Sequence, residues 1–333
     1  MEEGKLSTHY RHAWTLRRKL LVFIPLTFLI LSLALGLGLG LTLGRDGNDD
    51  DDDEAGSNKT SPLPSPSTPL LWTPPLNSTW QILLQNPILP PTPSSPLVPD
   101  VGIYDLDLFD TPASTIAALH ALGKKVICYF SAGTYEPGRP DSGQFQEADM
   151  GKAVEGWPGE RWVRLGSEGV RGIVRARVRL AREKGCDGVD PDNVDGYQND
   201  NGLGLTPQSS ISFMSYLSNL TTPLNLTLGL KNAGDIIATV LPIVHFSVNE
   251  ECVKENECAT FHQFIDAGKP VFHIEYPQDA GKKLRDSEVG KYCGGKGMQG
   301  FSTVMKKMEL DGWVEYCDGR VEVTGVNQTE GAH

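Results

Sequence analysis

The sequence predicts an α/β domain of the (β/α)8, or TIM-barrel, class, and three observations support this prediction. Short apolar runs alternate with helical stretches from residue 101 to residue 305. Eight such runs can be counted, and strands that alternate with helices form parallel βαβ units. Most of the runs end in polar or acidic residues, as expected where the C-terminal ends of barrel strands build a site.

The individual elements follow from apolar runs and from glycine and proline signals. The expected strands are 101–106, 125–130, 161–165, 185–190, 226–232, 244–250, 270–276 and 300–305. The expected helices are 111–122, 168–184, 207–220, 257–267 and 279–291. The fourth strand should stop at Pro191, because proline cannot donate to a ladder. Residues 80–84 would be a ninth strand, so either they are an N-terminal addition or the run 161–165 is not a barrel strand.

The N-terminal part of the chain reads as a membrane anchor followed by a linker. Residues 20–44 are apolar or small and long enough to cross a bilayer, and basic residues precede them. We therefore expect a cytosolic segment at 1–19, a signal anchor at 20–44 and an acidic, Pro/Ser-rich linker at 45–76. A cleavable signal peptide is the alternative, but its apolar core is usually shorter.

The rest divides into the barrel at 77–325 and a tail at 326–333, about 250 residues being the usual size of one barrel. This order predicts a single-pass type II protein of the cell membrane with an extracellular domain. Glycosylation sequons begin at Asn58, Asn77, Asn219, Asn225 and Asn327, all on the exported side.

Six cysteines lie on the same side and suggest up to three disulfides, which sequence alone does not assign. Cys252–Cys258 and Cys293–Cys317 are the pairs we would guess. Zinc is not expected, because no cysteine or histidine cluster has ligand spacing. The formal net charge of −12 argues against nucleic acid as a partner and is compatible with a cationic one.

Four aspartates stand close together in Cys186-Asp-Gly-Val-Asp-Pro-Asp-Asn-Val-Asp-Gly-Tyr197. Such a group repels itself and usually binds a cation or performs acid–base chemistry. A solvated acidic turn is the plain alternative, although Val189 indicates a strand that enters a core. The register of a calcium-binding EF-hand loop fails, because Val194 and Asp195 occupy positions 5 and 6 when Asp190 is position 1.

A second acidic group, Glu250 and Glu251, ends the sixth expected strand. Strands two apart in a barrel place their ends across the same pit, so the aspartate strand and Glu250 could form a glycosidase pair. A separation of about 5–5.5 Å would mean retention and a wider one inversion. Because Glu250 and Glu251 are adjacent, their charges should raise the pKa of whichever of the two is more buried, which suits a proton donor. No serine-hydrolase elbow or glycine-rich phosphate loop is present.

Several motifs resemble glycoside hydrolase family 114, the endo-α-1,4-polygalactosaminidases. They fall in order from about residue 80 to residue 305, and residues 1–76 resemble the stalk and anchor of fungal members. The motifs are Tyr104-Asp-Leu-Asp-Leu-Phe-Asp-Thr111, Cys128-Tyr-Phe-Ser-Ala-Gly-Thr-Tyr-Glu136, residues 185–197, Gly229-Leu-Lys-Asn232, Val248-Asn-Glu-Glu-Cys252 and Ile274-Glu-Tyr276.

The resemblance implies a barrel that cuts α-1,4-linked galactosamine polymers, with Asp192 as nucleophile and Glu250 as general acid/base in an endo-acting, retaining reaction. Asp190 is Glu in some members, which disfavours it as the nucleophile. The residues implied to line the pocket or bind substrate are Asp107, Tyr129, Ser131, Asp190, Asn193, Tyr197, Lys231, Asn232, Glu275 and Tyr276. A polycationic substrate would neutralise so many carboxylates.

No cofactor or metal is implied, and the protein is expected to be a monomer. Two other readings remain open at this point. One is a catalytically idle barrel that binds cell-wall polysaccharide, and the other is an α-glycosidase that acts on a neutral α-galactan. A polysaccharide deacetylase would need a metal site of Asp and His, for which the histidine spacing is absent.

Overall fold

The computed structural model describes residues 71–92 and 95–327. The strands are β1 Trp80–Leu83, β2 Ile103–Asp107, β3 Lys125–Ser131, β4 Thr134–Tyr135, β5 Met150–Ala153, β6 Arg161–Val163, β7 Gly188–Asp192, β8 Thr227–Lys231, β9 Phe246–Glu250, β10 Val271–Glu275, β11 Ser302–Met305, β12 Trp313–Tyr316 and β13 Val321–Val323. The α-helices are α1 Ala113–Ala121, α2 Glu168–Lys184, α3 Pro207–Thr221, α4 Ile237–Val240, α5 Cys258–Asp266 and α6 Asp286–Cys293.

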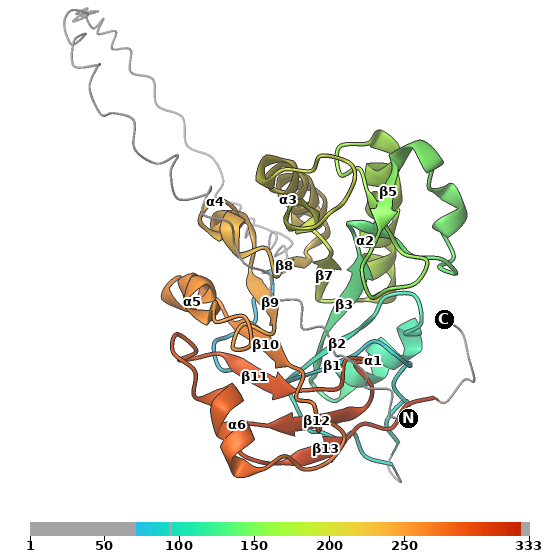
Figure 1. The fold of residues 1–333 in the computed structure, drawn as a ribbon. Helices are drawn as coiled ribbons and strands as arrows, with labels where there is room; N and C mark the ends of the chain where they lie inside the picture. The colour runs from blue at the N-terminus through green and yellow to red at the C-terminus, as the bar shows by residue number, and fades with distance from the viewer. Residues whose placement is uncertain (1–70, 93–94, 328–333) are drawn as a thin grey trace, which may run out of the picture. The chain divides into compact units, whose positions relative to one another are not determined.

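The main sheet is parallel over its first eight strands, in the order β1-β2-β3-β7-β8-β9-β10-β11. β12 and β13 then continue it in the antiparallel sense. Helices connect most of the parallel strands and lie around the outside of the sheet (Figure 1). The predicted alternation of strands and helices is therefore present, in a strongly curled sheet that resembles a TIM barrel.

The curl brings the two ends of the parallel set together. The Trp80 indole Nε1 in β1 donates to the carbonyl of Ser302 in β11 at 2.8 Å, and its ring lies 4.9 Å from that of Phe272. The hydroxyl of Tyr316 in β12 donates to the Trp80 carbonyl at 3.1 Å. Phe246 packs on Phe272 inside the curl. Burial of these large rings stabilises the curled form, by about 1.5–3 kcal/mol for each fully buried side chain.

The helix ends follow signals in the sequence. The Ser167 hydroxyl accepts hydrogen bonds from the first turn of α2, which ends at Gly185 with φ 94°, a left-handed conformation that suits glycine. α2 turns Val170, Val174 and Val178 toward the core. Thr206 and Ser209 form a capping box at the start of α3. These helices fix the loops that surround β7.

Two strand predictions are wrong. The run 161–165 does not contribute a barrel strand, because β6 belongs to a separate antiparallel sheet in the order β4-β6-β5, called the insert below. The eighth strand of the parallel set is instead β1, which pairs with β2. The fourth predicted strand also continues through Pro191 to Asp192. Proline is tolerated there because β8 pairs with β7 only at Gly188 and Val189, so no ladder bond to β8 is lost.

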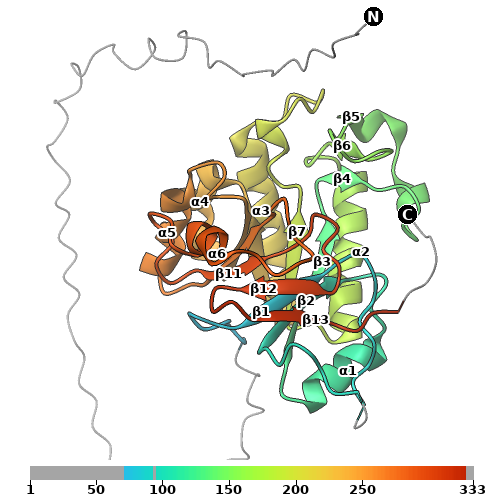
Figure 2. The ribbon, with the colours of Figure 1, turned by 60° about the horizontal axis from the view of Figure 1, so that its bottom comes forward.

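The insert lies beyond the C-terminal ends of β3 and β7 (Figure 2). Lys152 and Asp200 form an ion pair of 2.6 Å between the insert and the loop after β7. A Cβ atom on Gly151 would lie 2.1 Å from the Asn201 carbonyl, so the two backbones touch. Insert and loop therefore form one wall above the strand ends.

All six cysteines are paired, and both guessed disulfides, Cys252–Cys258 and Cys293–Cys317, are confirmed. The third, Cys128–Cys186, joins β3 to the residues just before β7. It closes a loop of 58 residues, for which chain entropy gives a stabilisation of about 4 kcal/mol.

The predicted anchor at 20–44 and most of the predicted linker lie outside the described residues. Within 71–92 and 95–327, no helix combines the length and the apolar character that membrane crossing requires.

Candidate active site

Lys231 stands at the centre of the candidate site, at the end of β8. Its Nζ lies 3.1 Å from Asp192 Oδ2 and 3.1 Å from Glu250 Oε2. These two carboxylate oxygens are therefore no more than twice that distance apart. Burial opposes the charge on Lys231, but Asp192, Glu250 and Asp190 together raise its pKa well above the ordinary value. The structure thus brings the predicted pair together across one buried ammonium.

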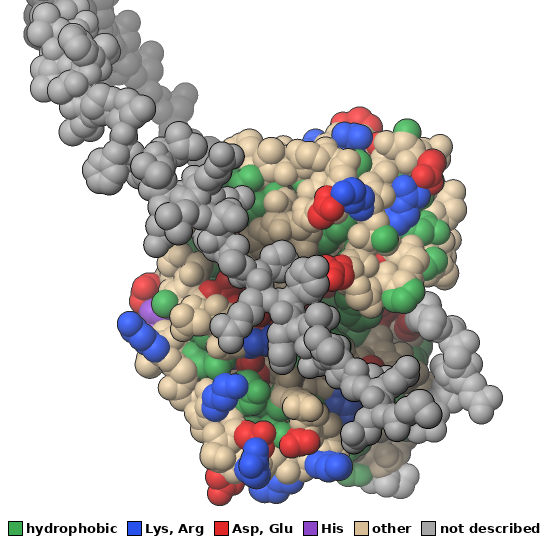
Figure 3. All heavy atoms as spheres, viewed as in Figure 1, with side chains coloured by type: hydrophobic (Ala, Val, Ile, Leu, Met, Phe, Trp, Pro, Cys, Tyr) green, Lys and Arg blue, Asp and Glu red, His purple; other side chains and the backbone are tan. Residues whose placement is uncertain are grey.

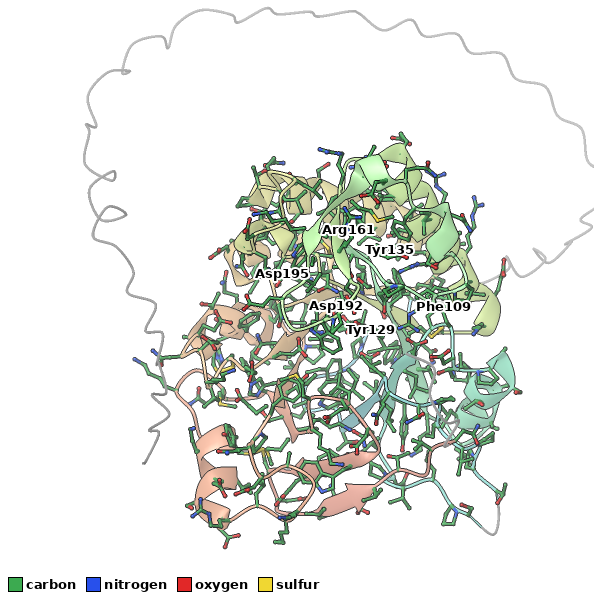
Figure 4. The ribbon with its side chains drawn as sticks, turned by 45° about the vertical axis from the view of Figure 1, so that its right-hand side comes forward. Phe109, Tyr129, Tyr135, Arg161, Asp192 and Asp195 are labelled. Carbon is green, nitrogen blue, oxygen red and sulfur yellow. A yellow bond between two sulfur atoms is a disulfide. The ribbon has the colours of Figure 1, made fainter. Side chains whose placement is uncertain are left out.

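Asp192 is held from three directions at the end of β7. The Tyr129 hydroxyl donates to Oδ2 at 2.8 Å, and the backbone N–H of Asn193 donates to Oδ1 at 2.7 Å. Lys231 supplies the third contact. Asn193 itself has φ 60°, a left-handed conformation that asparagine tolerates. Figure 4 shows Tyr129 beside Asp192 below the insert.

Glu250 is held in the same way at the end of β9. Asn232 Nδ2 donates to Oε2 at 3.1 Å, and the Tyr276 hydroxyl donates to Oε1. Although burial favours the neutral acid, Lys231 and these donors lower the pKa of Glu250. We expected the pKa of Glu250 to be raised by Glu251. That expectation is wrong, because cationic and hydroxyl donors rather than Glu251 dominate its surroundings.

Two further carboxyls, Asp105 and Asp190, lie below this pair and are fully buried. None of their four oxygens has a hydrogen-bond partner among the described residues. Burial raises the pKa of Asp190 to about 8 against the pull of Lys231, with Asp192 and Glu250 adding to the rise. Burial and Asp190 raise the pKa of Asp105 as well. Asp190 is therefore largely a neutral acid near pH 7, and the pKa of Asp105 is shifted in the same direction.

The upper wall of the site also carries carboxyls with raised pKa values. Burial and the charge of Asp192 raise the pKa of Asp195, in the loop after β7, to about 7. Burial and Glu136 raise that of Glu160, on the insert, to about 7. In Figure 4, Asp195 lies on the side of Asp192 that faces the insert. Acidic side chains also gather near the middle of the face shown in Figure 3.

The other predicted site residues divide into those near the pair and those bound elsewhere. Ser131 accepts from Asn193 Nδ2 at 3.0 Å, so both belong to the site. Asp107 is engaged by Arg139 at 2.8 Å and caps the backbone of Phe109. Tyr197 is half-buried in the short 3-10 helix Gly196–Gln198, next to Asp195 in the chain.

Glu275 does not join this group, which corrects its assignment to the pocket. Its Oε1 accepts from the Val253 N–H at 2.7 Å and lies 3.0 Å from His273 Nε2. Tyr276, the next residue in the chain, contacts Glu250 instead. Glu275 holds the loop that follows Glu250.

Sequence reasoning missed several residues of the site. Asp105 could have been found by parity, since it shares a strand face with Asp107, as Asp190 does with Asp192. The contacts of Arg139, Thr134 and Glu160 depend on how the insert folds back, for which the sequence carries no local signal. Arg177 is fully buried and joins α2 to the Ser131 carbonyl and to Asp141.

In the described part of the chain, one group places three potential metal donors within reach of one another, namely Cys252, Cys258 and His273. The two sulfurs form a disulfide, so they cannot serve as thiolate ligands.

Two carboxyl groups close together at the C-terminal ends of parallel strands in a TIM-barrel-like sheet are an arrangement used by glycoside hydrolases. The sequence profile of glycoside hydrolase family GH114 matches residues 61–322. The chain therefore belongs to family GH114.

Two solved structures are similar. One is the crystal structure of Aspergillus fumigatus Ega3 in complex with galactosamine, with 48% identity, a TM-score of 0.70, and coverage of 74% of this chain and 97% of that one. The other is the glycoside hydrolase domain of PelA from Pseudomonas aeruginosa, with 14% identity and a TM-score of 0.54. It covers 75% of this chain and 99% of that one, and at this identity it supports the fold alone. A search of curated proteins found no match.

Proposed function

We propose that this glycoside hydrolase cleaves α-1,4-galactosaminidic bonds within cationic, galactosamine-containing polysaccharide, with retention at the anomeric carbon. The observation that carries the proposal is the pair Asp192 and Glu250, bridged by Lys231 at 3.1 Å on each side. Their nearest oxygens are closer than the gap of about 6.5–9.5 Å that an inverting enzyme leaves for water. The similarity to Ega3, crystallised with galactosamine, supports the sugar.

The reaction follows from the two positions. Asp192 attacks the anomeric carbon while Glu250 gives a proton to the departing glycosidic oxygen, which forms a glycosyl ester and a shortened chain. Water then attacks the same carbon, and Glu250 takes its proton while Asp192 leaves. The Tyr129 hydroxyl, the Asn193 N–H and Lys231 hold the Asp192 carboxylate in position.

Glu250 must hold a proton when the first bond breaks, yet its surroundings favour the ionised form. Substrate must therefore displace Lys231 or Tyr276 from this carboxylate. Release of either donor raises the pKa of Glu250, because both contacts stabilise its charged form. Binding and protonation are thus coupled in this account.

The walls of the site suit a cationic polymer. Asp195, in the loop after β7, has a pKa of about 7, so part of its population is neutral at that pH. A nearby ammonium group favours the ionised carboxylate. A galactosamine unit would supply that charge, whereas a neutral galactan would not.

The direct test incubates the full-length chain with partly deacetylated α-1,4-galactosamine polymer and identifies the products by mass spectrometry. Wild type should release oligomers, and Asp192→Asn and Glu250→Gln should lower the rate by at least roughly 1,000-fold. Asp200→Asn is the matched control, since this exposed aspartate lies in the loop that follows Asp192 and pairs with Lys152.

The alternative functions, and an alternative nucleophile, predict different results in this test. Binding of polymer by wild type without cleavage would favour the idle binding barrel, and equal cleavage of a neutral α-galactan would favour the neutral glycosidase. Cleavage by Asp192→Asn at the wild-type rate would remove Asp192 as nucleophile and direct attention to Asp190.

We further propose that the strands close into a complete (β/α)8 barrel and that the protein is a monomer.

We also propose that residues 20–44 hold the protein in the cell membrane, with the enzyme domain outside the cell. The apolar length of that segment, the basic residues before it and the sequons after it support this orientation. Surface biotinylation of intact cells and a mass decrease on enzymatic deglycosylation should both be seen, and labelling only after lysis would contradict it.

A further inference from the structure

The insert packs closely against the backbone of Asp192 and Asn193, at the end of β7. The backbone N–H groups of Ala132 and Gly133 both donate to the Asp192 carbonyl, at 2.9 and 3.1 Å. Val163 in β6 donates to the Gly133 carbonyl at 2.9 Å. A Cβ atom on Gly133 would lie 1.7 Å from the Asn193 carbonyl oxygen. The turn between β3 and the insert is therefore packed directly on Asp192 and Asn193.

A chain of side-chain hydrogen bonds runs through this contact. Asn193 Nδ2 donates to Ser131 Oγ at 3.0 Å, Ser131 Oγ lies 2.5 Å from Thr134 Oγ1, and Thr134 Oγ1 donates to Glu160 Oε2 at 3.2 Å. Each hydroxyl has one proton. Because the Thr134 proton points to Glu160, the Ser131 proton must point to Thr134. All the bonds then run in one direction and end on a carboxylate, which strengthens them cooperatively.

The near end of the hydrogen-bond chain meets the reaction. Asn193 is the residue whose backbone N–H donates to Asp192 Oδ1 at 2.7 Å. The bond from its side chain to Ser131 anchors the same residue and so holds this N–H in place. We propose that Glu160 is a positioning residue for Asp192, acting through Thr134, Ser131 and Asn193. This proposal rests on the function proposed above and assigns the insert a part in the reaction.

The position of Glu160 makes its contribution depend on pH. The charged and titratable groups that face it are Glu136 and Arg139 from the insert connection, Tyr129 from β3 and Asp192 from β7. Burial and Glu136 raise the pKa of Glu160 to about 7. Above that pH the carboxylate anchors the hydrogen-bond chain, and below it the neutral acid is a weaker acceptor. Positioning should therefore strengthen as the pH rises through 7.

The test compares kcat and KM of wild type and Glu160→Gln on galactosamine polymer from pH 5 to pH 9. The amide oxygen still accepts from Thr134 but never carries charge. The ratio of wild-type to variant kcat should rise from about one at pH 5 to roughly three- to tenfold above pH 8, with its midpoint near 7. KM should change little. Taking the ratio cancels the titrations that both proteins share.

Two further variants separate positioning from stability. Thr134→Val interrupts the hydrogen-bond chain and should lower kcat by a similar factor. The double variant that combines Thr134→Val with Glu160→Gln should have a kcat no lower than that of Thr134→Val alone. Glu147→Gln is the matched control, because Glu147 lies in the insert and pairs with Arg161 outside this chain. It should leave the kcat ratio flat with pH. A flat ratio for Glu160→Gln, or an equal effect of Glu147→Gln, would overturn the proposal.

The wild type in the same assay reports on the proposed function separately. If wild type does not cut the polymer, that function fails, and positioning is then decided by crystal structures of the wild type and Thr134→Val. Positioning requires that the Asn193 N–H move away from Asp192 Oδ1 in the variant. An unchanged Asn193 would contradict it.

Discussion

Two buried lysines of the curled sheet have opposite electrostatic surroundings. Lys231, at the end of β8, lies between the carboxylates of Asp192 and Glu250, and these raise its pKa. Lys306 follows β11 and is equally buried, but its Nζ donates to neutral oxygens, those of Gln81 at 3.0 Å and the Asp311 carbonyl at 2.6 Å. Burial lowers the pKa of Lys306 to about 7.

The difference shows which buried charge the fold maintains. At β8 the two carboxyl groups hold Lys231 in its charged form, and Lys231 in turn lowers the pKa of Glu250. Where β1 meets β11 and β12, the lysine serves as a hydrogen-bond donor whose charge the fold does not stabilise. Substitution of the two lysines should therefore have different consequences for activity and for stability.

The largest effect is expected from Lys231→Met. The change leaves Asp192 and Glu250 facing each other without their shared cation, so the free energy of unfolding at pH 8 should fall by about 3–5 kcal/mol. The rate of polymer cleavage should fall roughly 100-fold or more. Urea unfolding and product analysis measure the two effects. Wild-type stability at pH 8 would contradict the comparison.

Lys306→Met should weaken the fold and spare the reaction. It leaves the Asp311 carbonyl without its donor, whereas Gln81 Oε1 keeps the bond from the Ile82 N–H at 3.0 Å, so the cost should be about 1–3 kcal/mol. At temperatures where the variant is folded, kcat/KM should stay within about twofold of wild type, because Lys306 touches no residue of the site. A loss of activity as large as that of Lys231→Met would refute the distinction.

The stability of wild type should also depend on pH through Lys306. The unfolded lysine keeps its proton to about pH 10, whereas in the folded protein its pKa is about 7. Between these values the unfolded chain binds more protons, so stability from this group rises with pH, by at most about 1.4 kcal/mol per pH unit. Denaturant titrations should show this rise in wild type and not in Lys306→Met.

Asp190→Asn should produce a slope of the opposite sign. The folded pKa of Asp190 is about 8, and that of an unfolded aspartate is about 4. The folded protein therefore binds more protons between these values, and this group makes stability fall as pH rises, by up to about 1.4 kcal/mol per unit. The amide cannot ionise, so the variant should lose less stability than wild type between pH 5 and pH 8. An identical slope would show that Asp190 is not a neutral acid.

The smallest effect is expected from Tyr276→Phe. Glu250 loses one donor but keeps Asn232 and Lys231. The maximal kcat/KM should fall by roughly three- to tenfold. The pKa of Glu250 should rise, so the loss of activity at high pH should begin at a higher pH than in wild type. A shift to lower pH would contradict the role of Tyr276 as a donor to Glu250.

The sequence predicted what depends on periodicity and on motifs. Strand and helix alternation indicated the curled parallel sheet, and the Asp-Asn and Asn-Glu motifs indicated the residues now found on either side of Lys231. These features follow from local sequence, in which side-chain direction alternates with residue number.

The rest depends on distant pairings. The run 161–165 could not be told from a barrel strand by sequence alone, because the three residues of β6 carry no information about their partner. The Cys128–Cys186 disulfide requires β3 and β7 to be neighbours, which the false strand at 161–165 obscured. The lowered pKa of Glu250 results from Lys231, Tyr276 and Asn232 converging on it from two other strands, against which its sequence neighbour Glu251 has little influence.

The most direct measurement is capture of the glycosyl ester on Asp192. Glu250→Gln incubated with α-galactosaminyl fluoride should form the ester, because fluoride leaves without an acid, and should release it slowly, because no base activates water. Mass spectrometry of the intact protein and of its peptides should find one added galactosaminyl group on the peptide that contains Asp192. Steady hydrolysis to the inverted product without an adduct, or an adduct on another residue, would contradict the proposed mechanism.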